Sequence, residues 1–274
     1  MKIVTLLENT SHAEGVHAAH GLSNYIETEK HRILFDMGPD YHFVQNAERL
    51  GVDLSQVDIA VLSHGHSDHG GGLMAFLALN DHASVYMRPG VFGEYYSLAG
   101  SHPHYIGLDP KLHEDDERFI FTDELCEIDD ELTLFAGVRD GMNALAASAK
   151  LKEQTDGGWK PDDFSHEQDL IVESGGKTVL FAGCAHMGIV NILNAARARL
   201  GRLPDAVFGG FHFFQLDPSD PASAELVDSV GRQLLEGDTV YYTGHCTGEF
   251  AYERLKTILG DRLRPMCGGC TELL

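Results

Sequence analysis

The sequence predicts an α/β fold. Short strand-like runs end repeatedly at a glycine or a histidine, and amphipathic helical stretches follow several of them, an alternation typical of the α/β class. With 274 residues, of which 43% are hydrophobic, the chain can bury a large core. We therefore expect a single domain spanning residues 1–274.

The amino-terminal part predicts strands and helices in a regular order. Two apolar runs flank a short polar connection, which indicates a hairpin; a helix, a buried strand, a second helix that starts at glycine and a further strand then follow. These elements are expected at 23–28, 32–38, 40–51, 57–64, 71–80 and 83–89.

The region from 87 to about 164 has poor periodicity, with only short strands at 118–123 and 131–137. Long irregular insertions in compact domains are usually substrate loops or disordered linkers. Interspersed tyrosines and Trp159 favour a substrate loop that forms a wall or lid of the pocket. Trp159 could stack on a flat ring there, although these aromatic residues could equally pack a minor core.

Regular structure returns after this region. A hairpin is expected at 169–184, with its turn at two glycines, followed by a helix at 185–201 that ends at Gly201. Two more units of a strand followed by a helix complete the chain. They are expected at 205–213 with 221–237, and at 239–248 with 249–260.

Composition limits the partners and the compartment. The 42 acidic and 20 basic residues give a formal charge of −22, which disfavours nucleic acid and anionic membranes as partners and leaves a small-molecule substrate. There is no signal-like segment, and no apolar run approaches about 18 residues. Five cysteines, an odd number, indicate reduced thiols. We expect a cytoplasmic protein, and composition leaves its oligomeric state open.

One short loop concentrates potential metal ligands. His64, His66, Asp68 and His69 fall within six residues after a buried strand, and the glycines at 65 and 70–72 give the backbone room to turn. Imidazole nitrogens and carboxylate oxygens bind zinc at similar distances of about 2.0–2.2 Å, so four such groups on one loop suit two adjacent cations. The alternative is a solvated polar loop with chance histidines.

The segment 63–72, "SHGHSDHGGG", resembles the His-x-His-x-Asp-His signature of the metallo-β-lactamase superfamily, and "ILFDMG" at 33–38 resembles the strand before it. The resemblance implies an αββα sandwich of two mixed sheets with helices outside and a two-metal site at the sheet edge. Further segments resemble the dihydropterin synthase-like branch, named for an enzyme that displaces pyrophosphate from a dihydropterin diphosphate. They are "HGLSNYIE", "HEQDLIVES", "GCAHMGIVNIL", "GGFHF" and "GHCTG".

The resemblance also implies ligands later in the chain: a further histidine, a bridging aspartate and a last histidine, each after a strand. His186 and His245 match the two histidines, but no aspartate follows the comparable strands. Cys184 stands where that aspartate is expected. A thiolate binds zinc well and could replace it, whereas a small buried cysteine is the alternative.

Other polar residues near strand ends are candidates for supporting roles. Asp36 could orient a ligating histidine from behind, and His212 could bind metal or line the substrate pocket. The Cys267 and Cys270 pair is open to three interpretations: a redox pair, half of a zinc knot or a plain turn. Histidines predicted to be loop or pocket residues rather than ligands are His102, His104, His113 and His166.

Together these features predict a metallo-hydrolase or a related transferase that holds two divalent transition-metal ions, zinc first, with iron or manganese as alternatives. Metal-bound hydroxide would be the nucleophile, and Asp68 would hold and orient it as the catalytic carboxylate. The substrate expected is a small phosphorylated or pterin-like metabolite. Two alternatives remain open: a diiron-type oxidoreductase on the same scaffold, and a non-catalytic protein that binds metal or ligand.

Overall fold

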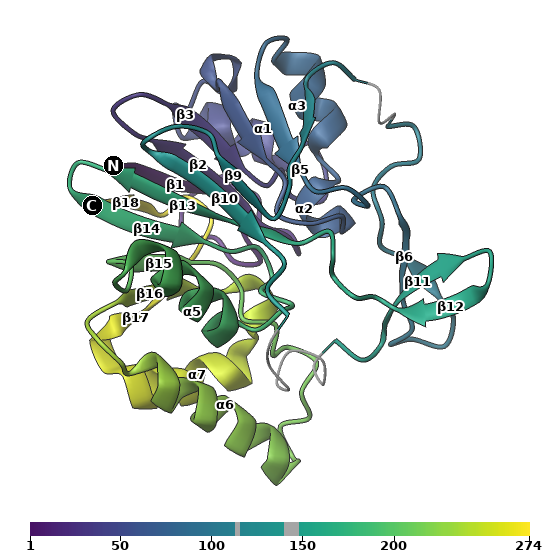
Figure 1. Cartoon of the computed structure of the whole chain (residues 1–274), viewed down its shortest axis with the longest axis vertical. Helices are drawn as coiled ribbons and strands as arrows, with labels where there is room; N and C mark the ends of the chain where they lie inside the picture. The colour runs from purple at the N-terminus through teal and green to yellow at the C-terminus, as the bar shows by residue number, and fades with distance from the viewer. Residues whose placement is uncertain (113–115, 140–147) are drawn as a thin grey trace.

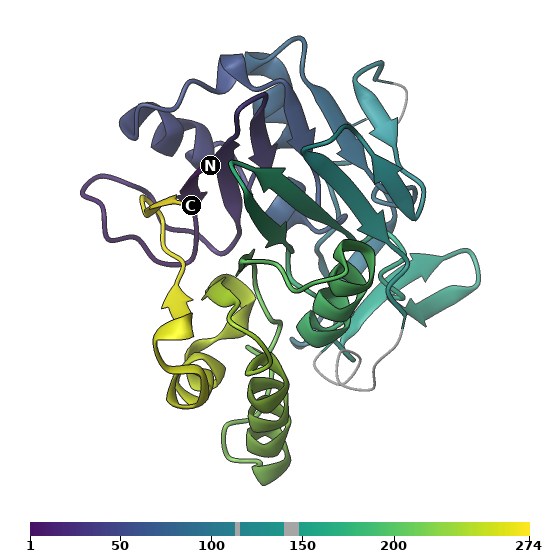
Figure 2. The same cartoon turned by 60° about the vertical axis from the view of Figure 1, so that its left-hand side comes forward.

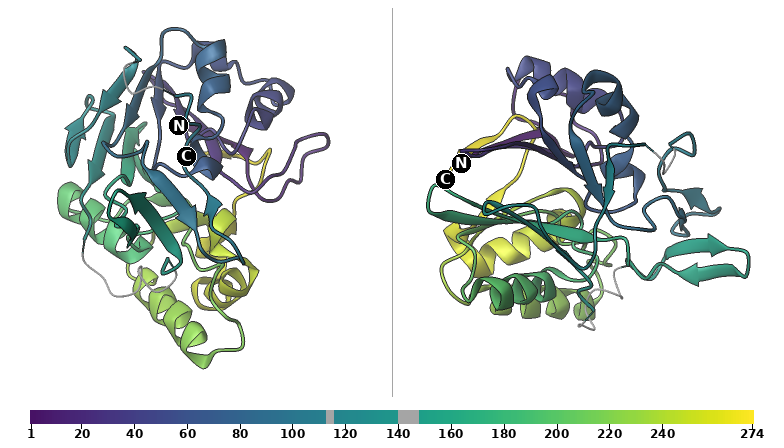
Figure 3. Two further views of the ribbon diagram at one scale, coloured as in Figure 1. Left: turned by 90° about the vertical axis from the view of Figure 1, so that its right-hand side faces the viewer. Right: turned by 45° about the horizontal axis from the view of Figure 1, so that its top comes forward.

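The computed structural model describes residues 1–112, 116–139 and 148–274. Two seven-stranded mixed sheets lie face to face and helices cover both outer faces, so the predicted αββα sandwich is confirmed (Figure 3). The first sheet is antiparallel from β18 to β3 and parallel from β3 to β8. Its order is β18 (Thr271–Leu273), β1 (Lys2–Leu7), β2 (Ser23–Glu27), β3 (Arg32–Phe35), β4 (Ile59–Val61), β5 (Ser84–Met87) and β8 (Phe119–Phe121).

The second sheet repeats this plan (Figure 1). It is antiparallel from β9 to β14 and parallel from β14 to β17. Its order is β17 (Leu263–Pro265), β16 (Val240–Thr243), β15 (Ala206–Phe208), β14 (Lys177–Phe181), β13 (Gln168–Ser174), β10 (Leu132–Ala136) and β9 (Leu125–Glu127). Each sheet therefore has a parallel half whose strands end at one common edge.

Helices cover the outer face of each sheet. They lie in the crossover connections between parallel strands and pack their apolar sides against the sheet. The amino-terminal helices are α1 (His42–Arg49), the single turn α2 (Ser67–Gly70) and α3 (Leu73–Leu79). The carboxy-terminal helices are α5 (Ile189–Leu200), α6 (Pro221–Leu234) and α7 (Glu249–Leu259). Short 3₁₀ turns are η1 (Leu54–Gln56), η2 (His245–Thr247) and η3 (Gly260–Arg262). As predicted, α5 ends at Gly201, which has a left-handed conformation.

Three apolar cores correspond to the three contacts between layers. One lies between the sheets, where Phe35 of β3 meets Phe181 of β14 with ring centroids 5.8 Å apart. A second joins the first sheet to α1 and α3, and a third joins the second sheet to α5, α6 and α7. Burial on both faces explains why the central strands read as continuous apolar runs in the sequence.

The region from 87 to 164 does not form one continuous insertion. Its middle strands, β8, β9 and β10, complete the edges of the two main sheets. Four other strands of the region form a sheet that projects from the sandwich (Figure 1), in the order β12 (Gly158–Pro161), β11 (Leu151–Thr155), β6 (Glu94–Ser97) and β7 (His104–Tyr105). Strands of two to five residues carry too little periodicity to be assigned to a sheet from sequence.

Both termini lie together at one end of the sandwich (Figure 2), where β1 pairs with β18. Cys267 and Cys270 form a disulfide beside this strand. The expectation that all the thiols are reduced is therefore wrong for this pair, because the turn brings the two Cα atoms to 5.5 Å. Among residues 1–112, 116–139 and 148–274, no helix has the length and apolar character needed to cross a bilayer.

Candidate metal centre

The predicted ligands converge because parallel strands end at the same edge of their sheets. Asp36 follows β3, and the loop that carries His64 to His69 follows β4. In the facing sheet, Cys184, His212 and His245 follow the adjacent parallel strands β14, β15 and β16. Stacking of the two sheets brings these two edges together.

Backbone strain is concentrated at this edge. Five non-glycine residues among those described have positive φ, between 48° and 60°. Each one is a predicted site residue or contacts one, and strained backbone of this kind persists where the surrounding structure fixes it. They are Asp36, Phe164, Ala185, His212 and His245. Ala185 connects Cys184 to His186, and the Phe164 ring stacks on His186 at 4.2 Å.

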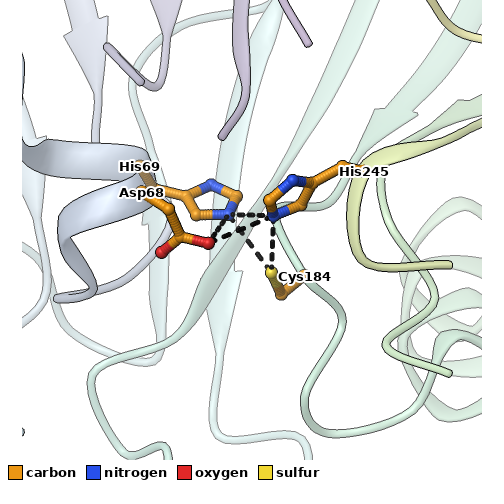
Figure 4. Close-up of side chains that lie close together, drawn as sticks. All are labelled: Asp68, His69, Cys184 and His245. Carbon is orange, nitrogen blue, oxygen red and sulfur yellow. Dashed lines mark hydrogen bonds and ion pairs between the residues drawn. The ribbon is translucent and has the colours of Figure 1, made fainter. Parts of the chain in front are cut away.

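A first group of ligand atoms comprises Asp68, His69, Cys184 and His245 (Figure 4). Cys184 Sγ lies 3.2 Å from His69 Nε2 and 3.3 Å from His245 Nε2. The two Nε2 atoms are 3.1 Å apart, and Asp68 Oδ2 is 3.2 Å from His245 Nε2. Two nitrogens, one sulfur and one oxygen form a donor set that zinc accepts.

Hydrogen bonds to the outer nitrogens of His69 and His245 determine which ring nitrogen faces this ligand group. Nδ1 of His69 lies 2.6 Å from Asp36 Oδ2, and Nδ1 of His245 lies 3.0 Å from Asn9 Oδ1. The Asn9 oxygen also accepts from the N–H of Gly21 at 3.2 Å, which is consistent with its orientation. Each Nδ1 therefore donates a hydrogen bond, and each Nε2 is left to bind a cation. The predicted supporting position of Asp36 is thus observed.

A second group lies beside the first and shares Cys184 with it. His64 Nε2 is 3.4 Å from His186 Nε2. The hydroxyl of Ser63 donates to Asp36 Oδ2 at 2.7 Å and accepts from Nδ1 of His64 at 2.9 Å. His64 therefore also presents its Nε2 lone pair to the centre.

His66 is oriented by a buried carboxylate that the sequence did not indicate. Its Nε2 lies 3.1 Å from Asp162 Oδ2, so Nε2 donates and Nδ1 is left for a metal. Asp162 is held in turn by His166 Nε2 at 3.2 Å, while His166 Nδ1 accepts from the N–H of Gly65 at 3.0 Å. His166 is thus a buried supporting residue. A further group of potential ligand atoms consists of His64, His66 and Asp68.

The local electrostatics favour metal-binding forms of most of these side chains. Burial and neighbouring histidines lower the pKa values of His64 and His186 well below their usual value. Burial acts to raise the pKa of Asp68, but His69 and His245 outweigh it, and the pKa lies well below its ordinary value. Neutral imidazoles and ionised carboxylates are the forms that bind metal.

The pKa of His69 shifts in the opposite direction to those of His64 and His186. Burial acts to lower its pKa, but the carboxylates of Asp36 and Asp68 outweigh that effect and raise the pKa to about 9. In the metal-free protein, the proton on His69 supplies the positive charge that these two carboxylates require. A metal ion at the same place would replace it. Donor chemistry and ring orientation therefore fit a bound metal cation. Burial and the neighbouring Cys246 raise the pKa of the Cys184 thiol well above its ordinary value, so a metal that binds there must displace the thiol proton.

A cavity of about 350 Å³ opens beside the centre, a volume suited to a small metabolite. The protruding sheet and its connections line one side of it, through Ser97, Ala99, His104, Ile106 and Leu151. His212 also lines it. The other lining residues are His20, Pro39, His66, Ser67, Asp68, Cys184, His186, Phe214, Gln215 and Cys246.

The prediction that Trp159 lines the pocket is wrong for this cavity. Trp159 is 47% exposed on β12 and packs edge-on against Tyr96, with ring centroids 4.9 Å apart. Aromatic content alone could not distinguish a residue that stacks on a ligand from one that packs against other side chains. His102 is exposed and lies outside the cavity lining, whereas His113 falls outside the described residues.

Sequence reasoning missed four residues of the site. Asp162 orients His66, and Glu167 accepts from the N–H groups of His186 and Met187 at 2.7 and 3.0 Å. His20 packs against His245 with the rings tilted and their centroids 4.7 Å apart. Cys246 lies beside Cys184. Cys246 directly follows a predicted ligand at a strand end, and His20 and Glu167 lie in segments that resemble the dihydropterin synthase-like branch, whereas Asp162 gave no such signal.

Comparison with known proteins agrees with this geometry. The model of the metallo-beta-lactamase superfamily matches residues 19–245. "Uncharacterized protein MJ0448" of Methanocaldococcus jannaschii is 30% identical over 93% of this chain and 94% of its own length. The same organism's 7,8-dihydropterin-6-methyl-4-(beta-D-ribofuranosyl)-aminobenzene-5'-phosphate synthase is 27% identical over 90% of this chain and 88% of its own.

Among solved structures, Tm1679, described as a metal-dependent hydrolase of the beta-lactamase superfamily, superposes with a TM-score of 0.79 at 26% identity, covering 100% of this chain and 99% of its own. Zn(2+)-bound PqqB from Methylobacterium extorquens shares the fold, with a TM-score of 0.56 at 14% identity and full coverage of both chains. The fold is the one shared by metallo-β-lactamase-fold proteins, and the candidate metal-ligand groups lie at its sheet edge. The chain belongs to the metallo-β-lactamase superfamily.

Proposed function

We propose that this protein is a dinuclear metal-dependent enzyme that hydrolyses, or displaces a group from, a small phosphorylated or pterin-like metabolite. The observation that carries the proposal is the convergence of oriented donor atoms in two adjacent groups beside a cavity of about 350 Å³. One group contains His69, His245 and Asp68. The other contains His64 and His186, and Cys184 belongs to both.

When bound, two such metal ions polarise the substrate and activate water at neutral pH. The chain itself supplies the positioning. Asp68 belongs to the first ligand group and also lines the cavity, where its carboxylate can orient water. The imidazole of His20 stands at the mouth, with Nε2 3.5 Å from Asp68 Oδ2. Both groups can thus contact a substrate that enters the cavity.

The cavity lining suits a flat metabolite that carries polar substituents. Ile106, Leu151 and Phe214 provide apolar surface, while Ser67 and Gln215 provide hydrogen-bonding groups. Phe214 is 44% exposed, so its ring is available to cover a ligand. A pocket that combines apolar walls with a few polar groups is typical of small-molecule sites. Zinc is the metal that the thiolate and imidazole donors favour.

The proposal is tested by metal analysis and turnover together. Protein made in metal-replete medium should hold up to about two transition-metal ions per chain; less than about half an equivalent would overturn the metal centre. A panel of a phosphodiester, a phosphomonoester and a lactone should show metal-dependent turnover. Asp68→Asn should lower it by about 100-fold or more, the scale of a lost acid–base group. The control is His82→Ala, at an exposed histidine that belongs to neither the ligand groups nor the cavity lining.

A transferase is the second candidate, favoured by the synthase-named relative. Incubation of the metal-loaded protein with dihydropterin and aminobenzene riboside phosphate precursors should then give the product which that name specifies, detected by mass spectrometry. Turnover of the hydrolytic panel without this product supports a hydrolase. Metal binding without either activity supports the non-catalytic alternative, and metal-dependent oxygen reduction supports the diiron alternative.

A further inference from the structure

A third cluster lies beside the two ligand groups and adds to Cys184 two residues that the proposed reaction does not use. A ring nitrogen of His212 and the sulfurs of Cys184 and Cys246 lie within 4.8 Å of one another, and all three residues are buried. They follow β15, β14 and β16, so three adjacent parallel strands each deliver one donor. Thiolate and imidazole are the donors preferred by thiophilic divalent cations.

His212 gives the independent sign of a ligand. Its side chain is 5% exposed, and neither ring nitrogen has a hydrogen-bond partner among the described residues. A buried imidazole without a partner forfeits the free energy of its lost hydration, roughly 1–3 kcal/mol. The ring also lines the cavity, and its backbone has a positive φ of 50°. A strained, unpartnered histidine next to two thiols indicates a site that is completed by a ligand.

The backbone around Cys246 leaves room for this arrangement. A Cβ atom on Gly210 would lie 2.3 Å from Cys246 Sγ, so glycine at this position permits the approach of the sulfur. Cys246 Sγ also lies 3.6 Å from the carbonyl oxygen of Cys184. Both thiols are free, whereas Cys267 and Cys270 are paired elsewhere.

We propose that Cys184, His212 and Cys246 form a thiolate-rich site for a third divalent cation such as Zn²⁺ or Cd²⁺, joined to the catalytic pair through Cys184. Binding forms bonds from the metal to two sulfurs and one nitrogen. It releases the thiol proton of Cys246 to solvent, because the proton of Cys184 has already left when the catalytic pair binds. The fourth position faces the cavity, which His212, Cys184 and Cys246 all line. This site goes beyond the proposed reaction, because that reaction needs neither Cys246 nor His212.

The test uses the full-length chain, reduced and freed of metal, and titrated with Cd²⁺. Bound metal is measured by elemental analysis after desalting, and thiolate coordination by ultraviolet charge-transfer absorbance. Wild-type protein should bind one more equivalent of Cd²⁺ than Cys246→Ser. The saturating absorbance of Cys246→Ser should fall to about half or less, because it loses sulfur–metal bonds. The matched control is Cys126→Ser, which changes a free thiol on β9 and should match wild type.

Two further variants separate coordination from folding. His212→Gln keeps both thiols and should weaken binding of the last equivalent by about tenfold or more. Gly210→Ala displaces the Cys246 sulfur without altering a ligand and should reproduce the loss of that equivalent. Circular dichroism verifies that each variant folds.

Equal metal content and equal absorbance in wild type and Cys246→Ser would overturn the third site. If both then bind two ions, the catalytic pair stands and only this inference fails. If wild type binds no metal at all, both proposals fail.

Discussion

Asp36 Oδ2 lies 2.6 Å from Nδ1 of His69, and both side chains are fully buried. The same carboxylate accepts from the backbone N–H and the hydroxyl of Ser63 at 2.8 and 2.7 Å. Asp36 therefore holds one ring directly and, through Ser63, a second ring at His64. One carboxylate behind the ligands thus orients a histidine in each of the two groups.

Replacing Asp36 by asparagine should weaken metal binding, because the amide carries no charge and one of its two polar ends cannot accept from His69. Loss of such a supporting partner typically costs about 10–100-fold in metal affinity. Competition with a chromogenic chelator measures the change. Asp81→Asn, at an exposed carboxylate, is the control. Unchanged affinity in Asp36→Asn would show that the ring orientation does not depend on this contact.

Replacing Cys184 by serine should have a broader effect, since its sulfur belongs to three of the potential ligand groups. A serine hydroxyl stays protonated near neutral pH and is a poor ligand, so metal affinity should fall on the order of tenfold or more. Cobalt-loaded wild type should show a sulfur-to-metal charge-transfer band that this variant lacks. Cobalt-loaded wild type without such a band would make Cys184 a packing residue only.

Removing metal should lower thermal stability. Bound cations contribute stability by mass action, about 2.7 kcal/mol at a hundredfold excess over the dissociation constant. For a chain of this size that corresponds to a decrease in Tm on the order of 5–10 °C. Differential scanning calorimetry with and without a chelator measures it, and added Zn²⁺ should restore the original Tm. An unchanged Tm would contradict tight binding by the native state.

The ion pairs of His31, which lies outside the ligand groups, should make a pH-dependent contribution to the stability of the fold. Its ring bridges Asp58 of the first sheet's β3–β4 connection at 2.5 Å and Asp129 of the β9–β10 turn at 2.9 Å. Burial acts to lower the pKa of His31, but these two carboxylates outweigh it, and the pKa is raised above its usual 6.5. The charged form is therefore stabilised by folding.

The direction of the pH dependence of stability follows from the raised pKa of His31. The stabilisation is fully present below the unfolded pKa of 6.5 and is lost as pH rises through the higher folded pKa. His31→Gln should lower Tm by about 1–4 °C at pH 5.5 and by less at pH 9, as expected for a partly exposed pair. His82→Gln is the matched control at an exposed histidine. A difference that grows with pH would contradict the assignment.

The sequence by itself determined the fold class and the first half of the site. His64, His66, Asp68 and His69 are close in the chain, and local spacing after a strand is sufficient to bring them together. Alternating strands and helices predicted the α/β class, because each helix has its own apolar periodicity, and the resemblance to the metallo-β-lactamase superfamily implied the two mixed sheets.

Only the tertiary structure decided which residues distant in the chain complete the site. Cys184 meets His69 across 115 residues, and Asp162 meets His66 across 96, so both contacts depend on how the two sheets and the protruding strands pack. The same packing places Cys246 beside Cys184 and moves Trp159 away from the cavity. Sequence spacing sets the order of side chains along one strand, but the alignment of strand ends at a common edge is a property of the assembled sheets.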